Sequence, residues 1–309
     1  MAGALIIDKP EGLTSHDVVA RVRRAAGTRR VGHAGTLDPF ATGLLVCCIG
    51  TATRLVQFLV GLDKVYVATV RLGYATDTQD GTGNQITPIR SSAELGVEDL
   101  RRVLREFTGP QLQMPPMFSA KKVGGERLYR AAREGRRVER QAVRIVVYSM
   151  EMMEGDEAGL FANKDGTRDF CVQVRCSSGT YIRTLANDVG EKLGVGAHLV
   201  KLRRTQVGQF RLTDGLTLAK LETMERDELS AVMISPSDLL SHLPIVALDE
   251  EQRIRVTNGR ALTLSDEMAS TFEPGAQMLR LCDGNGRLVA VGNFDPAVRL
   301  ISPRIVLAG

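Results

Sequence analysis

An aspartate followed by proline stands in a glycine-rich segment near the N-terminus, RRVGHAGTLDPFATGLLVC, residues 29–47. The proline keeps the backbone of Asp38 extended rather than helical, and the glycines permit unusual dihedral angles or the close approach of a ligand. A carboxylate held in such a loop can act as a nucleophile. The alternative is that Asp38 caps a helix over residues 41–47, which is the commoner role of an isolated Asp-Pro. His33, taken alone, is more typical of a structural hydrogen-bonding histidine than of a catalyst.

Basic residues lie next to or near aromatic or apolar residues in three further segments. In SSGTYIRTLANDVGEKLG, Tyr181 and Arg183 are predicted at the end of a strand with both side chains on one side. An aromatic ring can stack on a base and a guanidinium can hold an anion, although a core tyrosine beside a surface arginine is the commoner case. In DKVYVATV, Lys64 and Tyr66 share one strand face, and in LRRTQVGQF the apolar Leu202 precedes two arginines.

A basic patch follows in the middle of the chain. Residues 101–144 contain 12 Lys/Arg and 4 Asp/Glu, a local net charge of 12 − 4 = +8, with Phe118 and Tyr129 interleaved. Such a combination suits a structured RNA, whose phosphates need charge and whose unstacked bases need aromatic partners. A solvated helix face is the alternative. The residues that we expect to contact RNA phosphates are Lys121, Lys122, Arg127, Arg130, Arg133, Arg136 and Arg137.

The elements that must position these residues alternate irregularly over the first 240 residues. Apolar alternation predicts strands at residues 3–10, 63–73, 144–153 and 169–177. Helical spacing predicts helices at residues 15–26, after a Thr14/Ser15 cap, at residues 97–109, closed by Gly109, and at residues 182–194. Strands outnumber what strict βαβ alternation gives. We therefore predict an α+β fold with a mixed, largely antiparallel sheet and flanking helices.

The last part of the chain has a different character. Residues 245–309 carry 7 basic and 8 acidic residues in short alternating runs separated by turn signals such as TNGR and DGNG. This pattern predicts a small β-barrel or sandwich. Pro236 and Pro244 mark a boundary before it. A length of 309 residues also favours about two domains, and we expect them at residues 1–243 and 244–309.

Composition excludes several classes of protein. Apolar residues make up 43% and charged residues 25%, which is typical of a globular chain. The five cysteines form no CxxC pair and the four histidines no HxxxH pair, which argues against a disulfide scaffold, a zinc ribbon or a metal site. No apolar run approaches the roughly 18 residues of a membrane helix, and the start lacks the basic region of a secretory signal. We expect a cytoplasmic protein with reduced cysteines and no membrane association.

Together, these segments resemble the bacterial TruB-type tRNA pseudouridine synthases. The similarity follows family order across most of residues 1–240, and the C-terminal segment resembles the small PUA-type RNA-binding module of such enzymes. The motifs that carry it are KPEGLTSHD (residues 9–17), GHAGTLDPFATGLL, DKVYVATVRLG, PPMFSAKK, GTYIRTL and LRRTQVGQF.

The resemblance implies isomerisation of uridine-55 in the T arm of tRNA to pseudouridine. It implies no metal or organic cofactor, the tRNA T stem-loop as partner and no obligatory protein partner. The family's catalytic aspartate falls on Asp38 and its aspartate-pairing arginine on Arg183. Its remaining site residues fall on His33 (substrate contact), Tyr66 and Tyr181 (active-site tyrosines) and Leu202 (base pocket). Phe40 stands where the family more often has leucine, a conservative change.

The implied chemistry explains why these residue types occur together. Uracil must leave C1′ through nitrogen, turn over and reattach through C5. A carboxylate can attack C1′ or the pyrimidine ring, and Arg183 can keep a buried Asp38 ionised. One tyrosine can stack the uracil while the other removes the C5 proton, and the residues do not say which does which. The target base must be flipped out of the folded T arm, and His33 can fill the vacated space.

Two rival functions remain at this point. A retaining-type glycoside or nucleoside hydrolase using Asp38 needs a second carboxyl group as general acid, and the neighbouring segments offer only Asp188, on a predicted helix. A non-catalytic RNA-binding protein would use the basic patch and the C-terminal module alone. It gives no reason for Asp38, Tyr66 and Arg183 to occur together. We favour the isomerase over both.

Overall fold

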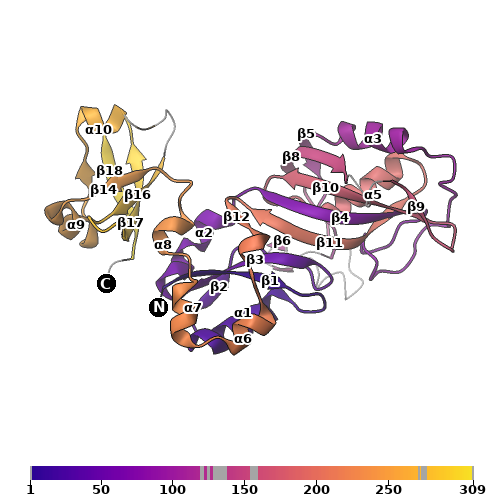
Figure 1. The fold of residues 1–309 in the computed structure, drawn as a ribbon. Coiled ribbons are helices and arrows are strands. Elements are labelled where there is room, and N and C mark those ends of the chain that lie inside the picture. Colours follow the sequence, from indigo (N-terminus) through magenta and orange to yellow (C-terminus); the bar gives the residue numbers. More distant parts are fainter. Residues whose placement is uncertain are drawn as a thin grey trace.

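Two β-sheets form the framework of the chain (Figure 1). The computed structural model describes residues 2–118, 122–123, 126–127, 138–153, 159–270, 272 and 277–307. The larger sheet lies within the first 217 residues and the smaller one follows it, toward the C-terminus. Figure 1 shows the smaller sheet at one end of an elongated molecule.

The larger sheet is mixed but largely antiparallel, as predicted. Its main path runs β13-β1-β3-β11-β4-β10-β8-β5, and β2, β9 and β12 pair at its margins. Among the described strands of this sheet, only β1 with β13 and β3 with β11 pair in parallel. Its strands are β1 (Gly3–Lys9), β2 (Val31–His33), β3 (Thr42–Ile49), β4 (Lys64–Leu72), β5 (Gly109–Gln113), β8 (Val143–Met152), β9 (Phe161–Ala162), β10 (Arg168–Cys176), β11 (Ala197–Val207), β12 (Phe210–Arg211) and β13 (Leu216–Thr217). A separate two-stranded hairpin pairs β6 (Lys122–Val123) with β7 (Glu126–Arg127).

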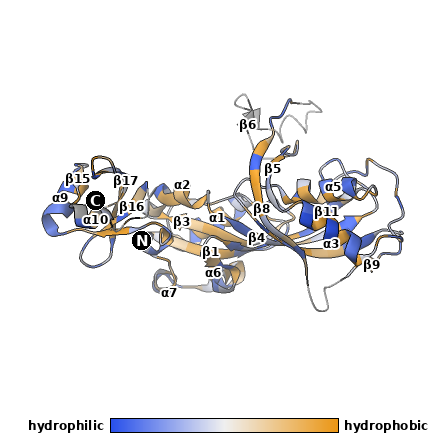
Figure 2. Cartoon of the chain, turned by 90° about the horizontal axis from the view of Figure 1, so that it is seen from above, coloured by the Kyte–Doolittle hydropathy of each residue, from blue (hydrophilic) through white to orange (hydrophobic). Residues whose placement is uncertain are grey.

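Helices cover the two halves of this sheet separately. Helices α3 (Val97–Glu106) and α5 (Ile182–Lys192) pack on β4, β8 and β11, whereas α1 (Ser15–Ala26) and α6 (Leu218–Thr223) pack on β1 and β3. Figure 2 shows hydrophobic residues concentrated along the strands. Shorter helical segments complete the connections: α2 (Val56–Leu59), α7 (Arg226–Ala231), α8 (Pro236–Leu239) and the 3₁₀ turns Gly50–Leu55 and Leu212–Asp214.

The two halves meet where β3 runs beside β11. Gly43 lies opposite Arg204 in this short parallel pairing. It has a φ of +100°, and a Cβ there would stand 2.3 Å from the Arg204 carbonyl oxygen. Only glycine allows both this backbone conformation and this close approach. The glycine-rich segment therefore joins the two halves of the sheet, and the loop that carries Asp38 lies directly before β3.

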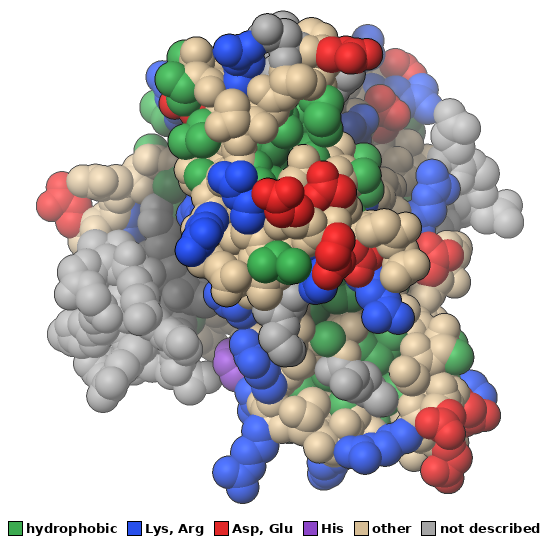
Figure 3. Space-filling view, turned by 90° about the vertical axis from the view of Figure 1, so that its left-hand side faces the viewer, with side chains coloured by type: hydrophobic (Ala, Val, Ile, Leu, Met, Phe, Trp, Pro, Cys, Tyr) green, Lys and Arg blue, Asp and Glu red, His purple; other side chains and the backbone are tan. Residues whose placement is uncertain are grey.

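The C-terminal unit is β-rich, as predicted, and also contains helices. Its five strands are ordered β14-β16-β17-β18-β15. They are β14 (Ile245–Ala247), β15 (Leu262–Thr263), β16 (Met278–Cys282), β17 (Leu288–Asp295) and β18 (Leu300–Val306), with helices α9 (Glu250–Thr257) and α10 (Asp266–Ser270) between them. Basic and acidic side chains are interspersed on the end of the molecule that carries this unit (Figure 3).

The structure differs from the sequence analysis in three local elements. The segment after Asp38 forms β3, so the alternative of a helix over residues 41–47 does not hold, because the apolar run Leu44–Ile49 is buried and pairs with β1. Helix α3 ends at Glu106, and Gly109, with a φ of +111°, begins β5 instead of closing the helix. Helix α9, which a capping box at Asp249 begins, was not foreseen.

All five cysteines are free, and four of them are buried. In the part of the chain that the structure describes, no helix is long and apolar enough to cross a membrane.

Candidate active site

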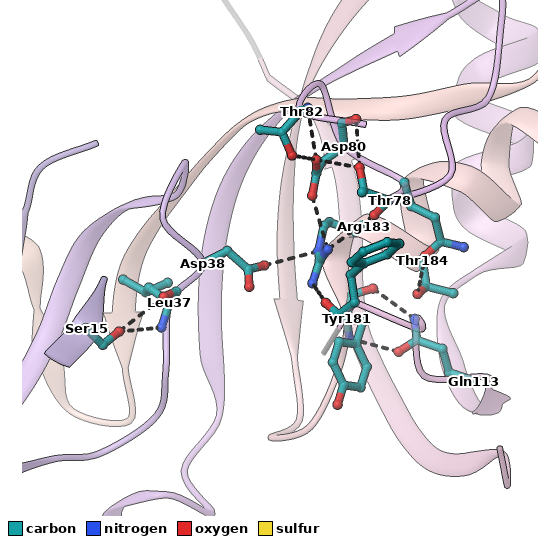
Figure 4. Close-up of polar contacts among 12 residues, drawn as sticks. Ser15, Leu37, Asp38, Thr78, Asp80, Thr82, Gln113, Tyr181, Arg183 and Thr184 are labelled. Carbon is teal, nitrogen blue, oxygen red and sulfur yellow. Dashed lines mark hydrogen bonds and ion pairs between the residues drawn. The ribbon is translucent and has the colours of Figure 1, made fainter. Parts of the chain in front are cut away.

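An ion pair between Asp38 and Arg183 is the centre of the site (Figure 4). The Nε of Arg183 lies 3.1 Å from Oδ2 of Asp38. The guanidinium also donates through Nη1 to the Thr78 carbonyl (3.2 Å) and through Nη2 to the Phe118 carbonyl (2.8 Å). The side chain of Arg183 is only 6% exposed, whereas that of Asp38 is 37% exposed. The structure therefore holds the arginine in the interior and leaves the carboxylate open to a substrate.

A second aspartate, Asp80, completes this network. Its Oδ2 lies 3.1 Å from Nη1 of Arg183, and the residue is 3% exposed. Its Oδ1 accepts hydrogen bonds from Thr78 Oγ1 (2.7 Å), from Thr82 N (3.0 Å) and from Thr82 Oγ1 (2.5 Å). Sequence reasoning missed Asp80. The available signal was TDTQDGTGN, a turn whose threonines and aspartates satisfy each other's hydrogen bonds.

The N-terminal motif holds the loop that carries Asp38. Ser15, buried at the start of α1, accepts a hydrogen bond from Leu37 N (2.9 Å) and donates one to Leu37 O (3.2 Å). The ammonium group of Lys9, also fully buried, donates to the carbonyls of Pro10 (2.9 Å), Leu13 (2.7 Å) and Pro39 (3.2 Å). Lys9 and Ser15 thus hold the two residues adjacent to Asp38, so the segment KPEGLTSHD fixes the position of the loop GTLDP.

Burial and charge act in opposite directions on Asp38. Loss of solvent around the carboxyl group raises the pKa of Asp38 above its ordinary value, and the negative Asp80 adds to the rise. The positive charge of Arg183, and more weakly that of Lys9, lowers the pKa of Asp38. Arg183 is therefore the main group that favours the ionised form of this carboxylate.

A pocket of about 230 Å³ opens beside Asp38. Tyr66, from the buried face of β4, and Leu202, from β11, form part of its wall, and Tyr181 lines it at the start of α5. Tyr66 is 8% exposed and Tyr181 is half-buried. Two further basic residues line the pocket, Lys64 on β4 and Arg204 on β11. The pocket thus combines an open carboxylate with two phenols, which can hold and deprotonate a flat polar ring.

Tyr181 and Arg183 do not continue a strand. Strand β10 ends at Cys176, and Tyr181 is the N-cap residue of α5, whose first turn contains Arg183. Gln113 fixes this start, because its side chain accepts from Tyr181 N (2.8 Å) and donates to Tyr181 O (3.0 Å). Both side chains nevertheless reach the same pocket.

The remaining predicted site residues lie elsewhere. His33, at the end of β2, does not line this pocket. Its ring stands edge-on to that of His16 with 5.6 Å between centroids, and its Nδ1 is buried without a hydrogen-bond partner among the described residues. Burial lowers the pKa of His33 to about 4, so this ring is neutral at physiological pH. Of the basic patch, Lys122 and Arg127 belong to the hairpin β6–β7. The other five residues, Lys121, Arg130, Arg133, Arg136 and Arg137, lie outside the described residues.

Metal ligands are not grouped in the described part of the chain, where no cluster of three or more His, Cys, Asp or Glu side chains can hold an ion. The general acid that a glycoside hydrolase requires has no good candidate there either. Asp188 lies on α5 and does not line the pocket. Asp80 is inaccessible and already accepts four hydrogen bonds, so it cannot give a proton to a leaving group.

Two solved structures have a fold similar to that of this chain over nearly its whole length. One is a chain from the crystal structure of a Cbf5-Nop10-Gar1 complex, with a TM-score of 0.72 and 26% sequence identity. The similarity covers 99% of this protein and 85% of that chain. A chain from an H/ACA RNP bound to a substrate RNA containing 2′-deoxyuridine gives a TM-score of 0.70 and 25% identity, with 99% and 85% of the two chains covered.

Sequence comparison defines the family more narrowly. Residues 23–182 match the N-terminal domain of the TruB family of pseudouridylate synthases, and residues 183–240 match the C-terminal domain of tRNA pseudouridylate synthase B. The tRNA pseudouridine synthase B of Geobacter sulfurreducens is 44% identical over 95% of this chain and 93% of its own. That of Geobacillus thermodenitrificans is 42% identical over 85% and 86%. The chain belongs to the TruB family of pseudouridine synthases.

Proposed function

We propose that this protein converts uridine-55 in the T arm of tRNA to pseudouridine, with Asp38 as the nucleophile. The observation that carries the proposal is the accessible Asp38 carboxylate, paired with a buried Arg183 at the edge of a pocket that contains two tyrosines. The names of the relatives support tRNA as the substrate. The choice of position 55 rests on the motifs that the chain shares with the family.

The geometry supports a division of roles. Asp38 attacks C1′ or the pyrimidine ring once the uridine is flipped into the pocket. Leu202 and the rings of the pocket then keep the detached uracil from diffusing away while it turns over. Tyr66 lies deep in the wall, and we assign to it the removal of the C5 proton. Tyr181, half-buried at the start of α5, is assigned to stacking. His33 lies outside the pocket, and we assign to it contact with the RNA that surrounds the flipped base.

The basic patch and the C-terminal unit are assigned to grip the tRNA backbone. We keep residues 1–243 as the catalytic domain and residues 244–309 as a PUA-like RNA-binding domain. The first strand of the C-terminal sheet, β14, begins at Ile245 and supports this boundary. In this arrangement, docking uses charge that is separate from the Asp38 pocket.

Nucleotide-resolution pseudouridine mapping on an unmodified tRNA transcript, incubated with purified protein without added metal, tests this function. We expect conversion at position 55 alone. Conversion at another position contradicts the site assignment. Release of free uracil would indicate a hydrolase, and binding without conversion would indicate a non-catalytic RNA-binding protein.

A further inference from the structure

Arg204 carries a positive charge into the interior of the sheet without a carboxylate partner. It is 1% exposed and is the largest of the fully buried side chains. Its Nε donates to the Leu44 carbonyl (2.8 Å) and its Nη2 to the Gly35 carbonyl (3.0 Å). Within the described ranges, no Asp or Glu lies within ion-pair distance of it. A buried charge without a counter-ion is costly, so this arginine needs a reason beyond packing.

Tyr66 is the polar group that faces Arg204. The two residues are directly paired across the ladder between β4 and β11, and both side chains line the pocket beside Asp38. The two carbonyl contacts use Nε and Nη2, which leaves Nη1 free of them. Two backbone carbonyls thus hold the Arg204 side chain in the pocket wall beside its cross-strand neighbour Tyr66.

Charges around the phenol act in both directions. Burial raises the pKa of Tyr66, while the positive charge of Arg204 opposes this rise. Cys176 on β10 and Asp38 in the loop add weakly to the rise. Lys64 lies on the same face of β4, but its ammonium group is directed to the carbonyls of Val60 (2.6 Å) and Leu62 (2.5 Å). Arg204 is thus the principal cation acting on Tyr66.

We propose that Arg204 is a positioning residue that orients the Tyr66 oxygen and stabilises negative charge on it, so that Tyr66 can take the C5 proton of the rotated uracil. This inference rests on the proposed function. Tyr66 gives its own proton to water and then accepts the C5 proton as a phenolate. When C5 bonds to C1′, the C5=C6 π pair makes the new bond, the electron pair that N1 kept from its broken bond to C1′ forms N1=C6, and C1′ releases the Asp38 oxygen where that oxygen had attacked C1′. When the phenolate then takes the C5 proton, the C5–H pair re-forms C5=C6 and the N1=C6 π pair returns to N1, which gains a proton from water.

A deuterium isotope effect separates this role from a structural one. The substrate is tRNA transcribed with [5-²H]uridine or ordinary uridine, and single-turnover rates are measured at saturating tRNA. We expect Arg204→Met to lower the rate by roughly 100-fold and to increase the isotope effect above the wild-type value, because C5 proton removal becomes limiting. Arg204→Lys should recover part of both changes, since it restores the charge without the two-pronged geometry.

Arg168→Met is the matched control. Arg168 also donates to two backbone carbonyls, those of Ser92 and Leu95 (2.8 and 2.9 Å), but it does not line the pocket. It should keep the wild-type isotope effect. If Arg204→Met does not fold, Arg204→Gln, which keeps a donor for the carbonyls, takes its place. A folded neutral variant with the wild-type isotope effect overturns this inference alone. A wild-type protein that makes no pseudouridine overturns the proposed function and the inference with it.

Discussion

Replacing Arg183 with methionine removes the group that links the two aspartates of the site. Asp80 is 4% exposed at its side chain and would lose its cation, although Thr78 and Thr82 continue to donate to it. Removing one partner of a buried ion pair costs about 3–5 kcal/mol. We expect the lower end, about 3 kcal/mol, because these threonine hydrogen bonds remain. Urea unfolding of Arg183→Met measures this change in the free energy of unfolding.

A second substitution identifies the source of the loss. Adding Asp80→Asn to Arg183→Met removes the buried charge that has lost its partner. The double variant should be about 1–2 kcal/mol more stable than Arg183→Met alone. The pH–rate profile of Arg183→Met supplies an independent readout. Without Arg183 the pKa of Asp38 rises further. Because only the ionised carboxylate is nucleophilic, residual activity should move to higher pH. Arg183→Lys should shift the profile less, since it keeps the charge but lacks the fork of donors.

A loss of stability in Arg183→Met no larger than that of an exposed ion pair, about 0–1 kcal/mol, together with an unchanged pH–rate profile, would refute this role of Arg183. A gain in stability from Asp80→Asn alone, in the protein that keeps Arg183, would also contradict this role. In that background the arginine still compensates the charge, so its removal should not stabilise the protein.

Three further predictions concern loop anchoring, docking and the C-terminal unit. Ser15→Ala leaves the buried Leu37 amide without an acceptor, so the free energy of unfolding, measured with urea, should fall by about 1–3 kcal/mol. The single-turnover rate should also fall. Wild-type values of both quantities would exclude the anchoring role. Neutralising several of Lys121, Lys122, Arg127, Arg130, Arg133, Arg136 and Arg137 should weaken tRNA binding and flatten its dependence on salt by roughly one unit or less of log–log slope per lost contact, with little change in single-turnover rate at saturating tRNA. A folded variant with wild-type affinity at every salt concentration supports a merely solvated basic face. A short T-arm stem-loop should remain a substrate, because the pocket lies within residues 35–204; complete loss of conversion would assign the C-terminal unit more than a grip.

Much of the fold could be predicted because its elements have clear local signals. The alternation in β4 buries every second residue, and the Thr14 cap begins α1 as expected. Segment 41–47 was ambiguous, since an apolar run of this length suits either a buried strand or a helix. Its partners β1 and β11 decide for the strand, and they are distant in sequence.

The site was predictable where one residue carries the chemistry and less so where several share it. Asp38 and Arg183 were paired through the family resemblance, and the structure brings them to 3.1 Å. Asp80 was missed because its role depends on a side chain 103 residues away, and a polar turn gives no sign of such a partner. Arg204 was seen only as one of two arginines after Leu202, since sequence alone does not show that it is buried opposite Tyr66.

Asp38→Asn gives the most direct test of the central claim, that the Asp38 carboxylate performs the reaction. Asp38 caps no helix, because β3 follows it, so the substitution should leave the protein folded. Conversion of uridine-55 and tRNA binding are measured on the same preparation. We predict that conversion is abolished while the affinity for tRNA stays within a few fold of wild type. A folded Asp38→Asn protein that forms pseudouridine at near the wild-type rate would contradict the account.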